Sequence, residues 1–405
     1  MRIAFLSSIY PAHAAKIYQE NPSLKNKSSD EQMEFIRWHA LSSYTRWNEY
    51  LAKQGFEVLE FHHSLHHVEL KWAEENEFYP TKENEIFKIG LEKIKRFKPD
   101  IIFCTSPLFY TQSNFLNELI NLLPEKTKLI AWYGANYGNE ETFRFFDLTL
   151  SNSKHLVKRL KKKEIHSDLL QHSFEPAILE KINIPEKRIN KLGFFGNLDT
   201  FTLDFEERNK LLLKISEIEN IMQVHGTIHR PKPLERLRYS TIKSRHYFSR
   251  TLSGLLPFEV LKKWSQLDNL PPSPWPLEKT FSQKVKPPLF GHEMLQSLSN
   301  YQIAFNYHNK HTGDNACNMR LFETTGVGCC LLTDHKSDIC SIFEPDSEIV
   351  TYSSPEEAIS KAQYLIKEPK FAEKIALAGQ KRTLTYYNSE KQVEHLVFHF
   401  RNLWN

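Results

Sequence analysis

Short apolar runs alternate with longer segments of helical period through the first half of the chain. Each run is short and nearly continuous in its apolar character, which is typical of strands in a parallel sheet that is covered on both faces. The expected strands are Ile3–Ser7, Val58–Phe61, Asp100–Cys104, Leu129–Tyr133, Asp147–Leu150 and Leu169–His172. The pattern therefore predicts a βαβ series and an α/β fold class.

Helical periodicity fills the gaps between these runs. One predicted helix, ending at Gly55, carries on one face Ile36, Ala40, Ser43, Trp47 and Leu51. Another, ending before Pro99, carries Phe87, Leu91, Ile94 and Phe97. Glycine often occupies the position just after a helix and proline cannot continue one, so both ends are marked in the sequence.

A second series of strands follows, and it indicates a second domain. Its expected strands are Lys191–Gly196, Met222–Gly226, Tyr301–His308, Gly328–Thr333 and Glu348–Tyr352. Ser354, Pro355 and Glu357 form a capping box ahead of a further helix. We expect the boundary near Phe174–Ile189, which separates an N-terminal domain of residues 1–180 from a second domain of residues 190–386.

The stretch from about residue 227 to 290 interrupts the second series. It holds nine of the chain's 20 prolines together with many arginines and lysines. A structureless loop of this length is unusual inside a compact domain, so we predict an insertion with its own helices near Leu234–Ser244 and Phe258–Gln266.

Composition narrows the class of protein only slightly. The chain has 405 residues, of which 40% are hydrophobic and 25% charged, and a net charge of +4 does not call for a nucleic-acid partner. Its five cysteines form no CxxC pair, which favours a reducing cytoplasm. No apolar stretch reaches the ~20 residues that span a bilayer, so any membrane contact is expected to be peripheral.

The segment Asn318–Asp334, NMRLFETTGVGCCLLTD, carries the strongest chemical signal. It places Arg320 and Glu323 on the opening turns of a helix that runs through two glycines into a buried strand. A guanidinium can bind a diphosphate, and a carboxylate can accept from both hydroxyls of a ribose. The alternative is a surface helix on which the two side chains simply pair at i, i+3.

From Pro288 to its C-terminus the chain resembles the CgeB-like branch of the group 1 glycosyltransferases. The matching blocks are Pro288–Gly291, Ile303–His308, Asn318–Gly328, Leu331–Asp334, Glu348–Ala358 and Ala378–Leu384. The resemblance implies a GT-B fold, in which two Rossmann-like domains with parallel sheets face each other. It also implies that residues 387–405 return to the first, acceptor-side domain, through a helix Ser389–Trp404.

The resemblance also implies a donor site for a nucleotide-sugar, which is a substrate and not a cofactor. Glu323 would hold the ribose and Arg320 would lie toward the diphosphate, with Asn318 in the same block. Gly326 and Gly328 would let the backbone approach the donor. Gly193 and Gly196 resemble the family's phosphate-side glycine turn, and His225 would lie near that turn.

One departure from the family concerns the transferred sugar. Many group 1 enzymes carry a second glutamate eight positions before the ribose glutamate, where this chain has Asn315 beside Asp314. The CgeB-like branch often lacks that glutamate. Asn315, Asp314 and His308 are therefore the candidates for a catalytic role near the sugar.

The chemistry expected from these residues is metal-independent sugar transfer. No Asp has another Asp two positions away, so the DxD motif of metal-dependent transferases is absent from the sequence. The resemblance implies retention of the anomeric configuration, for which the leaving phosphate can take the acceptor proton. An inverting enzyme would need a base from the first domain, where His13, His39 and Asp30 are candidates.

Two further clusters have alternative readings. The run HHSLHH, with His62, His63, His66 and His67, has spacing that could bind zinc, but a solvated strand-to-helix loop is favoured because no carboxylate or cysteine partner is nearby. The basic segment Lys154–Lys163 is expected to be a solvated helix face. Docking on an anionic inner membrane leaflet and nucleic-acid contact are the alternatives, and RNA binding is the weakest.

The sequence thus predicts a cytoplasmic glycosyltransferase that acts on a glycan, lipid-linked or protein acceptor in bacterial surface polysaccharide synthesis. Association with the cytoplasmic face of the membrane is the alternative location. The alternatives are a nucleotide-sugar epimerase of the same fold and a catalytically silent GT-B module that binds nucleotide or glycan.

Overall fold

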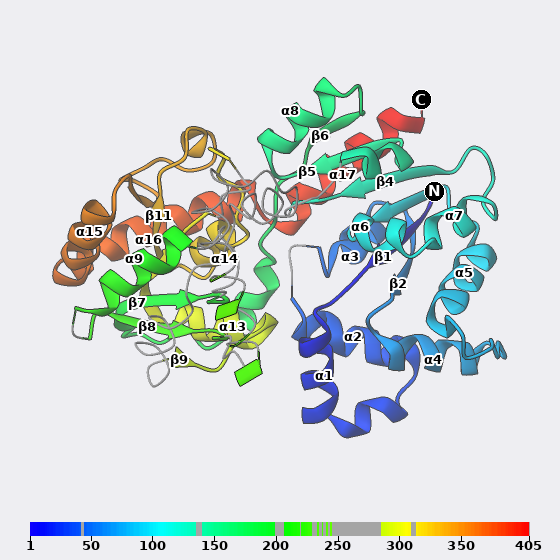
Figure 1. Cartoon of the computed structure of the whole chain (residues 1–405), viewed down its shortest axis with the longest axis horizontal. Coiled ribbons are helices and arrows are strands. Elements are labelled where there is room, and N and C mark those ends of the chain that lie inside the picture. Colours follow the sequence, from blue (N-terminus) through cyan, green and yellow to red (C-terminus); the bar gives the residue numbers. More distant parts are fainter. Residues whose placement is uncertain are drawn as a thin grey trace.

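Two six-stranded parallel sheets form the framework of the computed structural model (Figure 1). The structure describes residues 1–41, 44–134, 140–198, 206–218, 220–228, 285–308 and 313–404, with six isolated residues between 233 and 244. The first sheet has the order β2-β1-β3-β4-β5-β6. Its strands are β1 (Arg2–Ser7), β2 (Glu57–His62), β3 (Ile101–Cys104), β4 (Lys128–Trp132), β5 (Leu148–Ser151) and β6 (Ser167–Leu169).

The second sheet has the order β12-β11-β10-β7-β8-β9. Its strands are β7 (Ile189–Phe195), β8 (Met222–His225), β9 (Val285–Lys286), β10 (Tyr301–Asn306), β11 (Cys330–Asp334) and β12 (Val350–Tyr352). Strand order reverses between β1 and β3 in the first sheet and between β7 and β10 in the second. Ligands of open parallel sheets bind in the crevice beyond the carboxyl ends of the strands at such a reversal.

Helices cover both faces of each sheet (Figure 1). Along the first part of the chain lie α1 (Pro11–Glu20), η1 (Pro22–Asn26), α2 (Ser29–His39), α3 (Trp47–Lys53), α4 (His66–Glu75), α5 (Glu85–Phe97), α6 (Pro107–Gln112), α7 (Phe115–Ile120), η2 (Glu140–Phe145), α8 (Lys154–Lys162) and η3 (Pro176–Glu180). Along the second part of the chain lie α9 (Glu206–Ser216), α13 (Gly291–Ser299), α14 (Arg320–Gly326), η6 (Ile339–Ser341), α15 (Pro355–Lys367), α16 (Pro369–Tyr386) and α17 (Ser389–Trp404).

The alternation of side chains along a strand divides each core into two. Along β3, Ile101 and Phe103 join one apolar cluster while Ile102 and Cys104 join the cluster on the opposite face. All four side chains are fully buried. This explains why the strands read as continuous apolar runs: both faces of the sheet are covered, so no position needs to be polar.

The last helix, α17, packs against the first sheet and not the second, as predicted. Val393, Leu396, Val397 and Phe400 lie in the same apolar cluster as Ile101 and Phe103. The chain passes between the two halves at Phe174 and at Asn388, and these passages pair side by side as a parallel bridge. The α/β class with two parallel sheets and a returning C-terminal helix is therefore confirmed.

Three details differ from the sequence expectations. The single helix expected through Ile36 and Leu51 is wrong: α2 ends at His39, and a turn at Tyr44–Arg46 precedes α3, which begins at Trp47. Strand β6 lies at Ser167–Leu169, before the expected Leu169–His172. Strand β9 lies within the predicted insertion and completes the second sheet.

Most of that insertion, with the helices expected near Leu234–Ser244 and Phe258–Gln266, lies outside the described residues, as does Ser43. The predicted domain limits, 1–180 and 190–386 with 387–405, stay predictions.

Candidate active site

A cleft of about 1150 Å³ lies between the two domains, beyond the carboxyl ends of their strands. On the first domain it is lined by Ser8 after β1, Ser106 after β3 and Tyr133 after β4. On the second domain its wall includes Phe290 and the segment from Cys317 to Arg320 with Glu323. A large pocket shared by two domains at the strand-order reversals is where a substrate of this type of fold is expected.

Arg320 and Glu323 meet inside this cleft. The Glu323 side chain is 7% exposed and accepts a hydrogen bond from Arg320 Nη1 over 2.7 Å. Arg320 also donates from Nη2 to the carbonyl of Phe195, at the end of β7, over 3.2 Å. The i, i+3 pair of the alternative reading therefore exists, but it lies in the cleft wall, and it spans the reversal between β7 and β10.

Asn318 fixes the segment that leads into α14. Its side-chain amide donates to Asn306 Oδ1 over 3.2 Å and to the carbonyl of Tyr307 over 3.1 Å. Both acceptors lie at the carboxyl end of β10. The amide thus ties the loop carrying Cys317 and Asn318 to the sheet edge, and it keeps Arg320 beside Phe195.

The predicted donor-side glycines all make close backbone packing. A Cβ atom at Gly326 would overlap the Phe174 ring, and one at Gly193 would lie 2.9 Å from the Tyr301 ring. Gly328 has a φ of +70° and ends the turn between α14 and β11. Gly196, at the end of β7, lies against Gly226. Packing accounts for these glycines, and their contact with a donor stays a prediction.

His225 is packed behind β7. Its ring stacks on Phe195 with centroids 4.7 Å apart, and Nε2 lies 3.0 Å from the hydroxyl of Tyr301. Burial lowers the pKa of His225 to about 4, with a further contribution from the charge of Lys286. His225 does not line the cleft, but it supports the strand end whose carbonyl receives Arg320.

The three catalytic candidates follow β10, and unlike Glu323 they are not in the cleft wall. His308 is buried and its Nδ1 lies 2.8 Å from Asp334 Oδ1. Burial opposes ionisation of Asp334, yet the hydrogen bonds from His308 and the charge of Lys336 hold its pKa below the ordinary value. Asp314 is exposed, and Asn315 donates to its carbonyl over 3.3 Å. None of the three lines the cleft.

Of the three possible bases in the first domain, only His13 lines the cleft. Its ring stacks on Phe290 of the second domain with centroids 5.2 Å apart. Burial lowers its pKa to about 4, although the charge of Glu293 opposes this shift. His39 Nδ1 instead contacts the carbonyl of Phe35 at 2.8 Å, and Asp30 is exposed on α2.

The two domains touch around His13. Lys16 on α1 forms an ion pair with Glu293 on α13. Gly291 has a φ of +49°, and a Cβ atom there would overlap the backbone carbonyl oxygen of His39. This close approach of α13 to α2 holds one side of the cleft closed.

The histidine run is not a solvated loop throughout. His62 is buried at the end of β2 and His63 is half-buried, whereas His66 and His67 are exposed at the start of α4; His63 and His66 line the cleft. The expected loop is therefore wrong for His62, which lies in β2, and for His66 and His67, which lie in α4. Among the residues that the structure describes, no group of three or more His, Cys, Asp or Glu side chains is placed to hold a metal ion.

The basic segment forms α8, with one apolar and one solvated face as predicted. Leu156, Val157 and Leu160 are buried, whereas Lys158, Lys161 and Lys162 are exposed. Within the described part of the chain, no helix is both long and apolar enough to cross a membrane.

An aromatic wall on the first domain was not recognised in the sequence. Tyr44, Phe109, Trp132 and Tyr133 line the cleft together with His63. Trp132 ends β4, Tyr133 follows it, and His63 follows β2. Side chains at and just beyond the strand ends of a parallel sheet face its ligand crevice. That rule could have identified these three residues from the sequence.

Residues 245–397 match the family model described as Glycosyl transferase-like, which is less than half of the chain. A search of curated proteins by sequence found no match.

Solved structures resemble the whole chain at low identity. A glycosyltransferase from Rickettsia africae ESF-5 has a TM-score of 0.56 and 9% identity, and the match covers 99% of this chain and 98% of the other. An alpha-glucosyltransferase in complex with UDP-glucose and DNA containing an abasic site has a TM-score of 0.57 and 12% identity, with 100% of both chains covered. HepE of Anabaena, in complex with UDP and glucose, has a TM-score of 0.53 and 9% identity, with 99% of both covered.

Identities this low establish the fold alone. The chain therefore has the GT-B fold, and its similarity to the Glycosyl transferase-like family model is confined to residues 245–397.

Proposed function

We propose that this protein transfers a sugar from a nucleotide-sugar donor to a glycan, lipid-linked or protein acceptor. The observation that carries the proposal is the Glu323 carboxylate, nearly buried in the wall of a two-domain cleft and aligned by Arg320. A carboxylate offers acceptors only, so it suits the paired hydroxyls of a ribose. The guanidinium beside it supplies the positive charge that a diphosphate requires.

The position of this pair supports donor binding on the second domain. Arg320 bridges from α14 to the carbonyl of Phe195, so the pair lies where strand order reverses between β7 and β10. The solved alpha-glucosyltransferase and HepE have the same fold and were obtained with UDP-glucose or with UDP and glucose. We therefore take a nucleoside diphosphate sugar as the donor class and UDP as the first nucleotide to test.

The finer features of the proposal rest on the sequence. Absence of a DxD motif favours metal-independent transfer, in which Arg320 and backbone donors stabilise the leaving diphosphate. The CgeB-like resemblance favours retention of configuration and a role in bacterial surface polysaccharide synthesis in the cytoplasm. The exposed lysines of α8 favour peripheral contact with an anionic inner leaflet, where a lipid-linked acceptor would be reached.

Calorimetric titration of UDP, GDP, dTDP and CDP into the wild type and two Glu323 variants tests this function. Glu323→Gln keeps the size of the side chain and one acceptor oxygen, whereas Glu323→Ala removes both. We expect one nucleotide to bind the wild type, more weakly the glutamine variant and not measurably the alanine variant. The control is Glu373→Ala, because Glu373 is exposed on α16.

Turnover then separates the alternatives. Transfer of sugar from the matching donor that disappears in Glu323→Ala would exclude the silent module. Binding of no nucleotide by the wild type would reject the transferase and favour that module, and interconversion of the donor without an acceptor would favour the epimerase.

A further inference from the structure

His63 lines the cleft just after β2, the edge strand next to β1 in the first sheet. Its ring stacks on Phe109, with centroids 3.6 Å apart and planes 9° from parallel, and lies edge-on to Tyr110. Phe109 is 40% exposed. The stack therefore presents both an aromatic surface and an imidazole edge to the cleft.

Hydrogen bonds fix which nitrogen of His63 carries the proton. The Tyr110 hydroxyl donates to the carbonyl of Ser7 over 3.0 Å, which uses its only hydrogen. Its oxygen lies 3.1 Å from His63 Nδ1 and must therefore accept from that nitrogen. Burial raises the pKa of Tyr110 well above its ordinary value, so the hydroxyl keeps its proton.

The other nitrogen, Nε2, then carries a lone pair. Burial, assisted by the charges of His62 and His66, lowers the pKa of His63 to about 4. At neutral pH the imidazole is thus an acceptor at Nε2 and not a cation. An uncharged acceptor attracts hydroxyl donors and gives no attraction to carboxylate or phosphate oxygens.

Serine hydroxyls lie in the same part of the cleft. Ser8 Oγ and Ser106 Oγ are 2.7 Å apart at the ends of β1 and β3, and Ser64 Oγ accepts from the backbone N–H of Ile9 over 2.8 Å. All three serines line the cleft. Together with His63 they form a set of uncharged polar groups beside the partly exposed Phe109, in a cleft whose wall also includes Lys82 and Glu85.

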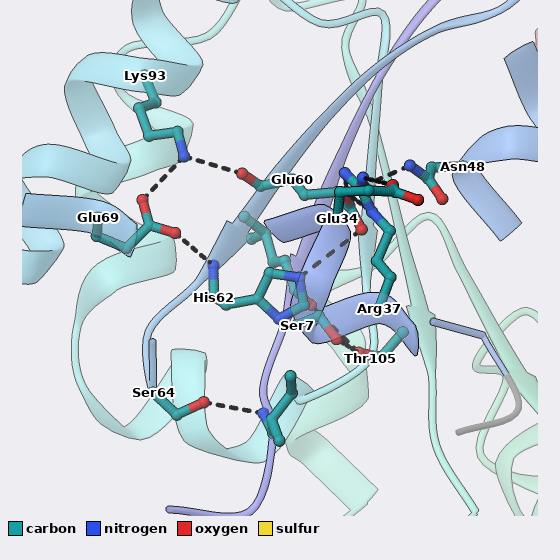
Figure 2. A network of polar contacts seen from close by, with 12 residues as sticks. Ser7, Glu34, Arg37, Asn48, Glu60, His62, Ser64, Glu69, Lys93 and Thr105 are labelled. Atoms are coloured by element: carbon teal, nitrogen blue, oxygen red, sulfur yellow. Dashed lines mark hydrogen bonds and ion pairs between the residues drawn. The ribbon is translucent and has the colours of Figure 1, made fainter. Parts of the chain in front are cut away.

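A buried charge network holds the turn that carries His63 and Ser64 (Figure 2). Glu69 accepts from the backbone N–H of His62 over 3.0 Å and from Lys93 Nζ over 2.8 Å. Lys93 also donates to the carbonyl of Glu60 over 3.0 Å. These bonds fix the last residues of β2, so His63, which follows directly, is positioned before any ligand arrives.

We propose that His63, Ser64, Ser106 and Phe109 form a subsite for a pyranose carbohydrate, in which a sugar hydroxyl donates to His63 Nε2 and the apolar face of the ring packs on Phe109. This inference rests on the proposed function and specifies it: among glycan, lipid-linked and protein acceptors, the group bound on the first-domain wall of the cleft is a neutral sugar. Uncharged acceptors, serine hydroxyls and an exposed aromatic ring are the groups that a neutral, hydroxyl-rich ring requires.

Saturation-transfer NMR with methyl α-D-glucopyranoside, methyl α-D-mannopyranoside, methyl β-D-galactopyranoside and methyl 2-acetamido-2-deoxy-β-D-glucopyranoside, in the presence of UDP, tests the subsite. His63→Phe keeps the stack on Phe109 and removes Nε2. We expect at least one glycoside to bind the wild type and to bind this variant about tenfold more weakly. The control is His395→Phe, because His395 is exposed on α17.

Binding of no glycoside to the wild type, or unchanged binding to His63→Phe, overturns the subsite. Selective ¹⁵N-histidine spectra give a second, independent readout: the proposal requires a neutral His63 with its proton on Nδ1, and a proton on Nε2 contradicts it. UDP titration separates the two proposals. Glycoside binding without nucleotide binding rejects the transferase alone, whereas nucleotide binding without glycoside binding rejects the subsite alone.

Discussion

Arg320 Nη1 lies 2.7 Å from Glu323 Oε2, and the same guanidinium reaches the carbonyl of Phe195 at the end of β7. The pair is more than a local helix contact, because it connects α14 with the first strand of the second sheet. Arg320 compensates a carboxylate that has little access to water.

Arg320→Met is expected to lower the free energy of unfolding by about 1 to 3 kcal/mol, because Glu323 loses its cation in a largely buried place. A double-mutant cycle with Glu323→Gln should give a coupling of about 1 to 2 kcal/mol in urea unfolding. The exposed pair of Arg144 and Glu141 has the same spacing and should show no measurable coupling. Equal coupling in both pairs would contradict a role for burial.

Gly291→Ala is expected to open the cleft. The new Cβ would overlap the carbonyl oxygen of His39, and the φ of +49° is unfavourable for alanine. Small-angle scattering should give a larger radius of gyration, and hydrogen exchange should increase in α13 and at the end of α2. Gly55→Ala is the matched control, because its φ is +84° but no atom lies within 4 Å, so only the backbone cost remains. An unchanged scattering curve for Gly291→Ala would show that the contact between α13 and α2 does not hold the cleft closed.

Lys93→Met is expected to cost about 3 to 5 kcal/mol of unfolding free energy, because it leaves the fully buried carboxylate of Glu69 without its cation. Adding Glu69→Leu should recover much of this loss, since the second substitution removes the stranded charge (Figure 2). Lys71→Ala, in the exposed pair with Glu74, is the control and should not change stability. Urea unfolding measures all three, and a double variant less stable than Lys93→Met would refute this account.

Acid should destabilise the protein through His172. Burial lowers the pKa of this residue to about 3, whereas the unfolded chain titrates near 6.5. As the pH falls, the unfolded state therefore binds a proton before the folded state does. The free energy of unfolding is highest above pH ~6.5 and should be about 3 kcal/mol lower at pH ~4. His172→Gln should flatten this part of the profile, and His395→Gln, on the exposed side of α17, should not. Chemical unfolding at several pH values measures the difference.

Exchanging the exposed lysines of α8 for glutamates should weaken binding to anionic membranes. The triple variant Lys158→Glu, Lys161→Glu, Lys162→Glu is compared with Lys367→Glu, Lys370→Glu, Lys374→Glu, which changes the net charge equally on α15 and α16. We expect the wild type and the second variant to sediment with phosphatidylcholine vesicles that contain phosphatidylglycerol, and the first variant to remain in solution. Equal loss of sedimentation in both variants would assign the effect to net charge alone. Unchanged sedimentation of the first variant would contradict membrane contact through α8.

The strand pattern predicted most of the fold because each strand is buried on both faces, so its local sequence records its environment. Runs such as Ile101–Cys104 needed no knowledge of the neighbouring strands. The two-residue strand β9 carries too short a pattern to be recognised, and the break between α2 and α3 falls where apolar spacing alone continues.

For the candidate site, too, the sequence determined local relationships and the tertiary structure determined long-range ones. The sequence by itself determined that Arg320 and Glu323 share one face of a helix, since residues three apart are neighbours on any helix. Only the tertiary structure decided that this face forms the wall of a cleft, that His13 meets Phe290 and that Tyr110 fixes the proton of His63. Those relationships join segments far apart in the chain, and local periodicity reports whether a residue is buried but not which distant residue it meets.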